Sequence, residues 1–177
     1  GHGPNRFASE SFVDEIAMAI GQDPAEYRLS LVNNPRAKNV IQKVMEMSSW
    51  GKSGGRIAQG IAYSDYNGSH SAGVAEISLD EKNGKIKVHR YFIAVDPGLP
   101  LIPDNVKAQI ESGVVYGISA ALTERVSHSD GIVDQSNFHD YEVLRMADVP
   151  DIVIEILPFG DRPSAVGELG LPTTAPA

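Results

Sequence analysis

The hydrophobic repeat of this chain changes from helical to strand-like after the first fifty residues and becomes helical again after Pro103, and this order restricts the folds that it can adopt. Up to Trp50, apolar residues recur at the spacing of amphipathic helices. Within residues 75–79 apolar and polar residues alternate, which is the period of a strand. One long helical pattern returns after Pro103, and a tail rich in Gly and Pro follows it. This order predicts an α+β fold rather than the alternating order of a doubly wound sheet.

Three start signals divide the N-terminal part into helices. Residues 11–14 are typical of a capping box, which predicts a short first helix that ends at Gly21. Asp-Pro at 23–24 and Asn-Pro at 34–35 each combine an N-cap side chain with a proline suited to the first turn. The third helix is expected to end near Trp50. One mostly apolar stripe at helical spacing runs along it, formed by Ala37, Val40, Ile41, Val44, Met45 and Ser48.

The central part predicts an antiparallel sheet that contains a hairpin. Asn-Gly at 83–84 suits a tight turn because both residues adopt positive φ easily. Strand-like residues 75–79 precede this turn and residues 86–95 follow it, with 56–66 expected as a third strand. A further short strand is expected in the tail, at residues 152–157.

One long helix is predicted from Pro103 onward. Gly113 and Gly117 lie four residues apart on it, so we expect this helix to approach a neighbour closely. Its apolar face consists of Val106, Ile110, Val114, Ile118, Ala121 and Leu122.

Composition excludes several classes of function. The 177 residues are expected to form a single domain, residues 1–177. With 15 Lys and Arg against 23 Asp and Glu the net charge is −8, and there is no basic cluster, so nucleic acid is not an expected partner. The chain has no cysteine, which excludes a thiolate nucleophile, Cys-ligated zinc and an iron–sulfur cluster held by these residues.

Few residues suggest chemistry by spacing alone. The Gly-rich connector 51–55 lacks the order of a phosphate-binding loop and follows a helix instead of a strand. The His and Asp residues at 128–130 and 139–140 lack metal-ligand spacing, so no metal ligand is predicted and surface positions are expected. Glu168 is a single carboxylate in a loop framed by Gly167 and Gly170. Such a residue is usually a solvated surface group, although small neighbours let a large ligand approach the backbone.

Several segments in the same order resemble the molybdenum hydroxylases, the superfamily of xanthine dehydrogenase and aldehyde oxidase. The segment around Glu168 and the final Thr-Ala-Pro-Ala resemble the G-V-G-E…A-P-A pattern of that family. Residues 1–5 and 137–141 resemble most closely the bacterial isoquinoline 1-oxidoreductase beta subunit group. Together the similar segments cover essentially the whole chain: residues 7–15, 21–24, 94–98, 109–113, 137–145, 164–168 and 174–177.

This resemblance implies a cofactor and a role for each matching residue. In the family the loop glutamate is the base that accepts a proton as a water-derived oxygen attacks the substrate carbon, and Glu168 is the matching position. It also implies that Gln109, Ala165, Val166 and Gly167 contact a molybdenum–pterin cofactor, expected as molybdopterin cytosine dinucleotide. The implied substrate is an aldehyde or an N-heterocycle, and the implied electron-accepting partner is a 2Fe–2S small subunit.

The resemblance also implies that these residues are the C-terminal part of a longer subunit. The rest of that large subunit is then a partner, and the isolated fragment is expected to be inactive and to hold no cofactor. Leu169 stands where the family usually has proline, and Ser112 replaces a usual glycine. An alternative is a non-catalytic binding or assembly module that retains the fold. The compartment is not predicted.

Overall fold

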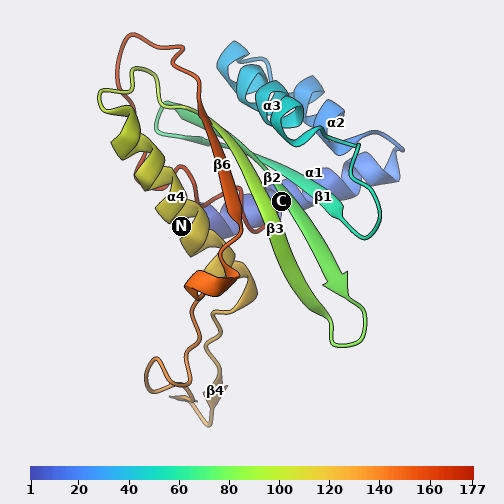
Figure 1. Ribbon diagram of the computed structural model, residues 1–177, viewed down its shortest axis with the longest axis vertical. Helices are drawn as coiled ribbons and strands as arrows, with labels where there is room; N and C mark the ends of the chain where they lie inside the picture. The colour runs from blue at the N-terminus through green and yellow to red at the C-terminus, as the bar shows by residue number, and fades with distance from the viewer.

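Helices cover both faces of a four-stranded sheet in the computed structural model, which describes residues 1–177 (Figure 1). This architecture confirms the α+β prediction. The elements are α1 His2–Ala19, α2 Pro24–Leu31, α3 Pro35–Ser48, β1 Ala58–Tyr66, β2 Ser69–Asp80, β3 Lys85–Asp96, α4 Pro103–Leu122, β4 His128–Ser129, β5 Ile132–Val133, a 3₁₀ turn Met146–Asp148 and β6 Asp151–Ile156. None of the four α-helices combines the length and apolar character that a membrane span requires.

The start signals of α2 and α3 are confirmed. The Asp23 carboxylate accepts hydrogen bonds from the backbone N–H of Ala25 at 2.9 Å and of Glu26 at 3.0 Å. The Asn34 side chain accepts one from the backbone N–H of Arg36 at 2.9 Å. These bonds satisfy N–H groups that have no partner within the helix.

The predicted start of the first helix is wrong. Helix α1 begins at His2, and Ser11 lies inside it without capping anything. Its N-terminal half is held by tertiary contacts: Arg6 pairs with Asp65, and the buried Glu10 accepts hydrogen bonds from Arg28 and from the Tyr63 backbone N–H, both at 2.8 Å. These contacts link α1 to α2 and β1, and a local capping signal carries no information about them.

The sheet is mixed rather than antiparallel, with strand order β1-β2-β3-β6. Strands β2 and β3 form the predicted hairpin, and Gly84 in its turn has φ +70°. Strand β6 confirms the short strand in the tail, but it pairs with β3 in parallel. Between β3 and β6 the chain passes through α4, which lies on one face of the sheet. Such a crossover connection lets β6 run in the same direction as β3.

Alternation along β2 did not predict which side chains are buried. Glu76 is only 6% exposed, whereas Leu79 is 54% exposed. The Glu76 carboxylate accepts hydrogen bonds from Gln59 at 3.1 Å and from Arg90 at 2.7 Å, which offset its burial. Leu79 is the last residue but one of β2. At that end the β2–β3 hairpin extends past the helices that cover the sheet (Figure 1).

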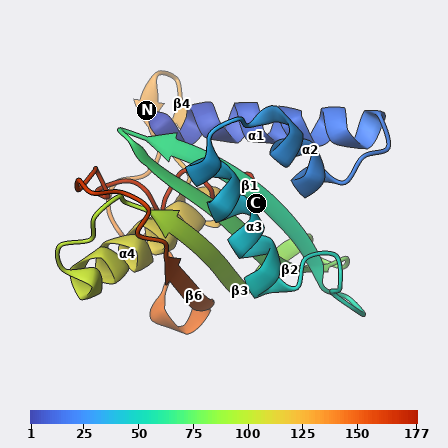
Figure 2. The ribbon, with the colours of Figure 1, turned by 90° about the horizontal axis from the view of Figure 1, so that it is seen from above.

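Two apolar cores lie on opposite faces of the sheet. Figure 2 shows α3 and α4 on the two sides, and each helix packs apolar side chains against the strands. The predicted face of α4 is confirmed from Val106 to Ile118, whereas Ala121 and Leu122 at its end are exposed. A projecting arm, residues 124–146, carries the small β4–β5 hairpin, which the sequence did not predict. The core under α4 also contains Leu169 of the C-terminal segment, so that segment is part of the packed structure.

Candidate functional site

The C-terminal segment after β6 passes between α4 and the sheet, at points where glycines leave room for it. A Cβ added to Gly113 would lie 3.1 Å from the Gly170 Cα, and one added to Gly117 would lie 2.0 Å from the Thr174 hydroxyl oxygen. On the sheet side, a Cβ at Gly73 would lie 3.0 Å from the Thr173 hydroxyl oxygen. The expected close approach to α4 is therefore confirmed, and the neighbour is this segment.

Buried contacts fix the segment on the C-terminal side of Glu168. Leu169 is fully buried beneath α4. The Tyr91 hydroxyl donates to the Thr173 hydroxyl oxygen at 2.9 Å, and burial raises the pKa of Tyr91. Although Leu169 replaces a usual proline, its burial holds the backbone next to Glu168 in place.

Gln109 joins α4 to the same loop. Its side-chain amide donates to the Gly167 carbonyl at 2.8 Å. The structure thus brings together two of the residues that the resemblance implied, and the contact orients the loop. The Gln109 side-chain oxygen accepts no hydrogen bond within the chain and remains available to a ligand.

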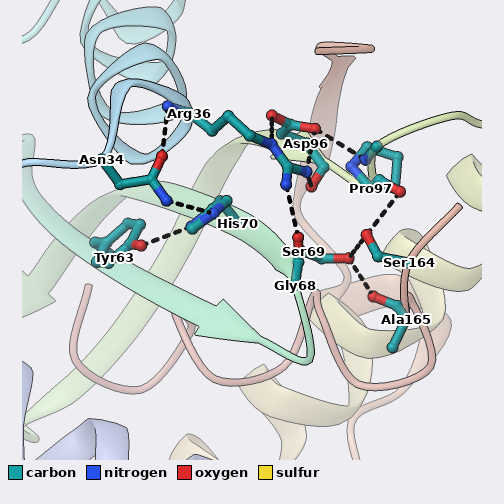
Figure 3. Close-up of polar contacts among 11 residues, drawn as sticks. Asn34, Arg36, Tyr63, Gly68, Ser69, His70, Asp96, Pro97, Ser164 and Ala165 are labelled. Carbon is teal, nitrogen blue, oxygen red and sulfur yellow. Dashed lines mark hydrogen bonds and ion pairs between the residues drawn. The ribbon is translucent and has the colours of Figure 1, made fainter. Parts of the chain in front are cut away.

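A polar network anchors the loop on the N-terminal side of Glu168 (Figure 3). The Ser69 hydroxyl donates to the Ala165 carbonyl at 2.6 Å and lies 2.7 Å from the Ser164 hydroxyl. The backbone N–H and the hydroxyl of Ser164 both donate to the Pro97 carbonyl, at 2.9 and 2.8 Å. Three chain segments that are distant in sequence therefore meet just before Val166.

An ion pair supports this network. The Arg36 guanidinium donates to both carboxylate oxygens of Asp96, at 2.6 and 2.7 Å, and to the Gly68 carbonyl at 2.9 Å. Asp96 is fully buried, and its carboxylate also accepts the Gly98 N–H at 2.9 Å. The hydrogen bonds to Asp96 raise the pKa of Arg36, so the guanidinium stays charged.

Glu168 itself is exposed beside a run of unused backbone donors. The N–H groups of Ala165, Val166, Gly167 and Glu168 donate to no acceptor within the chain. A Cβ added to Gly167 would meet no atom within 4 Å, so the backbone there faces open space. Consecutive free N–H groups next to open space suit a ligand rich in acceptor atoms, such as the phosphate and pterin groups of a molybdenum cofactor. The residues present therefore fit that group.

Sequence reasoning missed Ser69, Arg36 and Asp96. The Asp-Pro-Gly sequence at 96–98 is a signal that could have found Asp96, because aspartate at such a turn commonly accepts a backbone N–H two residues later. Nothing local distinguishes Ser69 from the other serines. Arg36 carries no signal, because its partner lies across the fold.

The other candidates form no site. His128, Asp130, His139 and Asp140 are exposed on the arm, where surface positions were expected. Hydrogen bonds from the Asn137 and Ser136 backbone N–H groups lower the pKa of Asp140 to about 2. No group of three or more His, Cys, Asp or Glu side chains in the structure is arranged to hold a metal ion.

Comparison with known proteins identifies the family of this chain. A family model described as the molybdopterin cofactor-binding domain matches residues 20–150, well over half of the chain. The chain belongs to the molybdopterin cofactor-binding domain family. The matched range includes Gln109 and ends before the loop that carries Glu168.

Similar proteins are much longer than this member of the family. The beta subunit of isoquinoline 1-oxidoreductase from Brevundimonas diminuta is 41% identical over 97% of the chain, which spans 23% of that relative. A nicotinate dehydrogenase subunit of Pseudomonas putida is 31% identical over 90% of the chain and is matched over 15% of its own length. The aldehyde oxidoreductase structure from Desulfovibrio desulfuricans has a TM-score of 0.82 over 99% of the chain and 37% of its own, at 14% identity, which supports the fold.

Proposed function

We propose that this chain is the C-terminal cofactor-binding part of a molybdenum hydroxylase large subunit, in which residues 1–177 form a single domain. The reaction adds oxygen from water to an aldehyde or an N-heterocycle. Similarity to proteins named for isoquinoline and nicotinate, both N-heterocycles, supports that substrate class. The observation that carries the proposal is the anchored loop, which combines an exposed carboxylate with four free backbone donors.

In this proposal Glu168 is the catalytic base. A general base must lie within hydrogen-bond reach of the proton that it accepts, about 2.6–3.2 Å between heavy atoms. Burial of Leu169 and the Gln109–Gly167 hydrogen bond restrict the backbone on either side of Glu168. The carboxylate is therefore presented from a fixed position, and it accepts a proton during the attack on the substrate.

The cofactor that we propose is a molybdenum–pterin in its cytosine dinucleotide form, which supplies the redox chemistry when it is bound. The backbone N–H groups of Ala165, Val166 and Gly167 are donors to its acceptor atoms. Gln109 holds the Gly167 carbonyl with its amide nitrogen and offers its free oxygen to a donor on the cofactor.

Two partners belong to this proposal. A 2Fe–2S small subunit accepts the electrons, because this chain has no cysteine to ligate a cluster. The remainder of the large subunit completes the cofactor and substrate sites. We expect the isolated 177-residue chain to bind no cofactor and to show no turnover.

The test is Glu168→Gln in the molybdenum-loaded enzyme that contains this chain. Loss of turnover with molybdenum content retained supports the base. The matched control is Glu81→Gln, an exposed glutamate in the β2–β3 turn, which should leave turnover unchanged. Unchanged turnover in Glu168→Gln would overturn the assignment and favour a non-catalytic binding or assembly module. Loss of molybdenum in that variant would also contradict it, because the residue would then act in cofactor retention.

A further inference from the structure

Ser69 joins the site loop to the start of strand β2. Its hydroxyl donates to the Ala165 carbonyl at 2.6 Å and lies 2.7 Å from the Ser164 hydroxyl. Ser69 is fully buried, so water does not replace these bonds easily. The loop that contains Glu168 is irregular, and its position therefore depends on such anchors rather than on a helix or strand ladder.

Arg36 holds the two segments that anchor the loop. Through the Gly68 carbonyl it fixes the residue before Ser69, and through the Asp96 carboxylate it fixes the end of β3, which leads into Pro97 (Figure 3). The Pro97 carbonyl in turn accepts both bonds from Ser164. One side chain on α3 thus sets the spacing between the two anchors of the loop.

We propose that Ser69 is a positioning residue for Glu168, and that Arg36 and Asp96 hold Ser69 in place. This inference rests on the proposed function, in which Glu168 is the base. A displacement of about 1 Å in a reacting group can reduce the rate of a reaction by about a hundredfold. Loss of the Ser69 hydroxyl leaves the Ala165 carbonyl without its partner, and the loop then samples positions in which the carboxylate is out of reach.

The experiment compares Ser69→Ala with Ser78→Ala in the molybdenum-loaded enzyme. Both serines lie on β2, and the Ser78 hydroxyl also forms a hydrogen bond of 2.7 Å, to His89, at the far end of that strand. We expect kcat of Ser69→Ala to fall about tenfold to a hundredfold, with KM and molybdenum content unchanged. Ser78→Ala should match the unmodified enzyme in all three.

Amide hydrogen exchange provides a readout that does not depend on turnover. The Ser164 N–H donates to Pro97 and the Leu169 N–H donates to Val166, so both amides report on the closed loop. We expect their exchange to be at least about tenfold faster in Ser69→Ala and unchanged in Ser78→Ala. Arg36→Lys keeps a positive charge but lacks the forked guanidinium, so its effect should have the same direction.

The outcomes separate this inference from the proposed function. If Glu168→Gln abolishes turnover while Ser69→Ala behaves like Ser78→Ala in both kcat and exchange, only the positioning role fails. If Glu168→Gln keeps full turnover, the proposed function fails, whatever Ser69→Ala shows. If Ser69→Ala does not fold, Ser164→Ala decides the question, because it removes the bonds to Pro97 and Ser69 at the half-buried end of the same network. The positioning role would also be overturned if Ser69→Ala lowered KM or lost molybdenum while the amide exchange of Ser164 and Leu169 stayed unchanged.

Discussion

Replacing Tyr91 with phenylalanine removes one buried oxygen from the packing between the sheet and the C-terminal segment. The Tyr91 hydroxyl donates to the Thr173 hydroxyl at 2.9 Å, and both side chains are fully buried. The ring of the phenylalanine keeps the apolar contacts, so the loss is confined to the hydrogen bond. An unsatisfied buried partner costs about 1–3 kcal/mol, and we expect Tyr91→Phe to lower the free energy of unfolding by that amount.

The assay is urea unfolding at 25 °C, followed by circular dichroism and fluorescence. For a chain of this size each kcal/mol shifts the melting temperature by about 2–4 °C, so thermal melts give a second measure. Tyr116→Phe is the matched control, because Tyr116 is 66% exposed on α4 and its hydroxyl forms no hydrogen bond within the chain. It should change the free energy of unfolding by less than about 0.5 kcal/mol.

A double-mutant cycle tests the physical reason. Thr173→Val preserves the shape of the side chain and leaves the Tyr91 hydroxyl without its acceptor. When both polar groups are replaced by apolar ones, the penalty for an unpaired group disappears. We therefore expect the double variant to lose at least about 1 kcal/mol less than the sum of the two single variants. Strict additivity, or a Tyr91→Phe loss no larger than that of Tyr116→Phe, would refute this account.

Three further expectations concern buried or titrating groups. Arg28→Met leaves the buried Glu10 without its charge partner and should lower the free energy of unfolding in urea by about 3–5 kcal/mol. Lys43→Met, which breaks the exposed pair with Glu46, should lower it by less than about 0.5 kcal/mol. Equal losses in the two variants would contradict this prediction. Burial raises the pKa of Tyr91 above its ordinary 10.0, so the unfolded chain loses the tyrosine proton at a lower pH than the folded chain does. The free energy of unfolding should therefore fall above pH 10, by up to about 1.4 kcal/mol per pH unit, and this fall should be smaller in Tyr91→Phe. Burial is the larger cause, and a nearby arginine the smaller, of a pKa of His70 below its ordinary 6.5. As the pH falls, the unfolded chain binds the histidine proton before the folded chain does. Urea unfolding should therefore show a free energy of unfolding that falls below pH 6.5, and this pH dependence should be weaker in His70→Gln.

Local signals predicted the elements whose causes are local. The caps at Asp23 and Asn34 and the turn at Gly84 depend on neighbouring residues, and the apolar face of α4 depends on a repeat within a single helix. Even the close approach at Gly113 could be predicted, because small residues at helical spacing indicate it. The family resemblance likewise pointed to Glu168 and Gln109, although their roles remain proposals.

Sequence alone determined the fold class, the starts of α2, α3 and α4, and the family, because each depends on periodicity, caps or contiguous motifs. Only the tertiary structure decided that α1 begins at His2, that β6 joins the sheet in parallel and that Gln109 holds the site loop. It also revealed Ser69 and Arg36 as anchors of that loop. These features depend on hydrogen bonds and ion pairs between residues that are distant in the chain. Such contacts leave no periodic trace in the sequence, because folding alone brings their partners together.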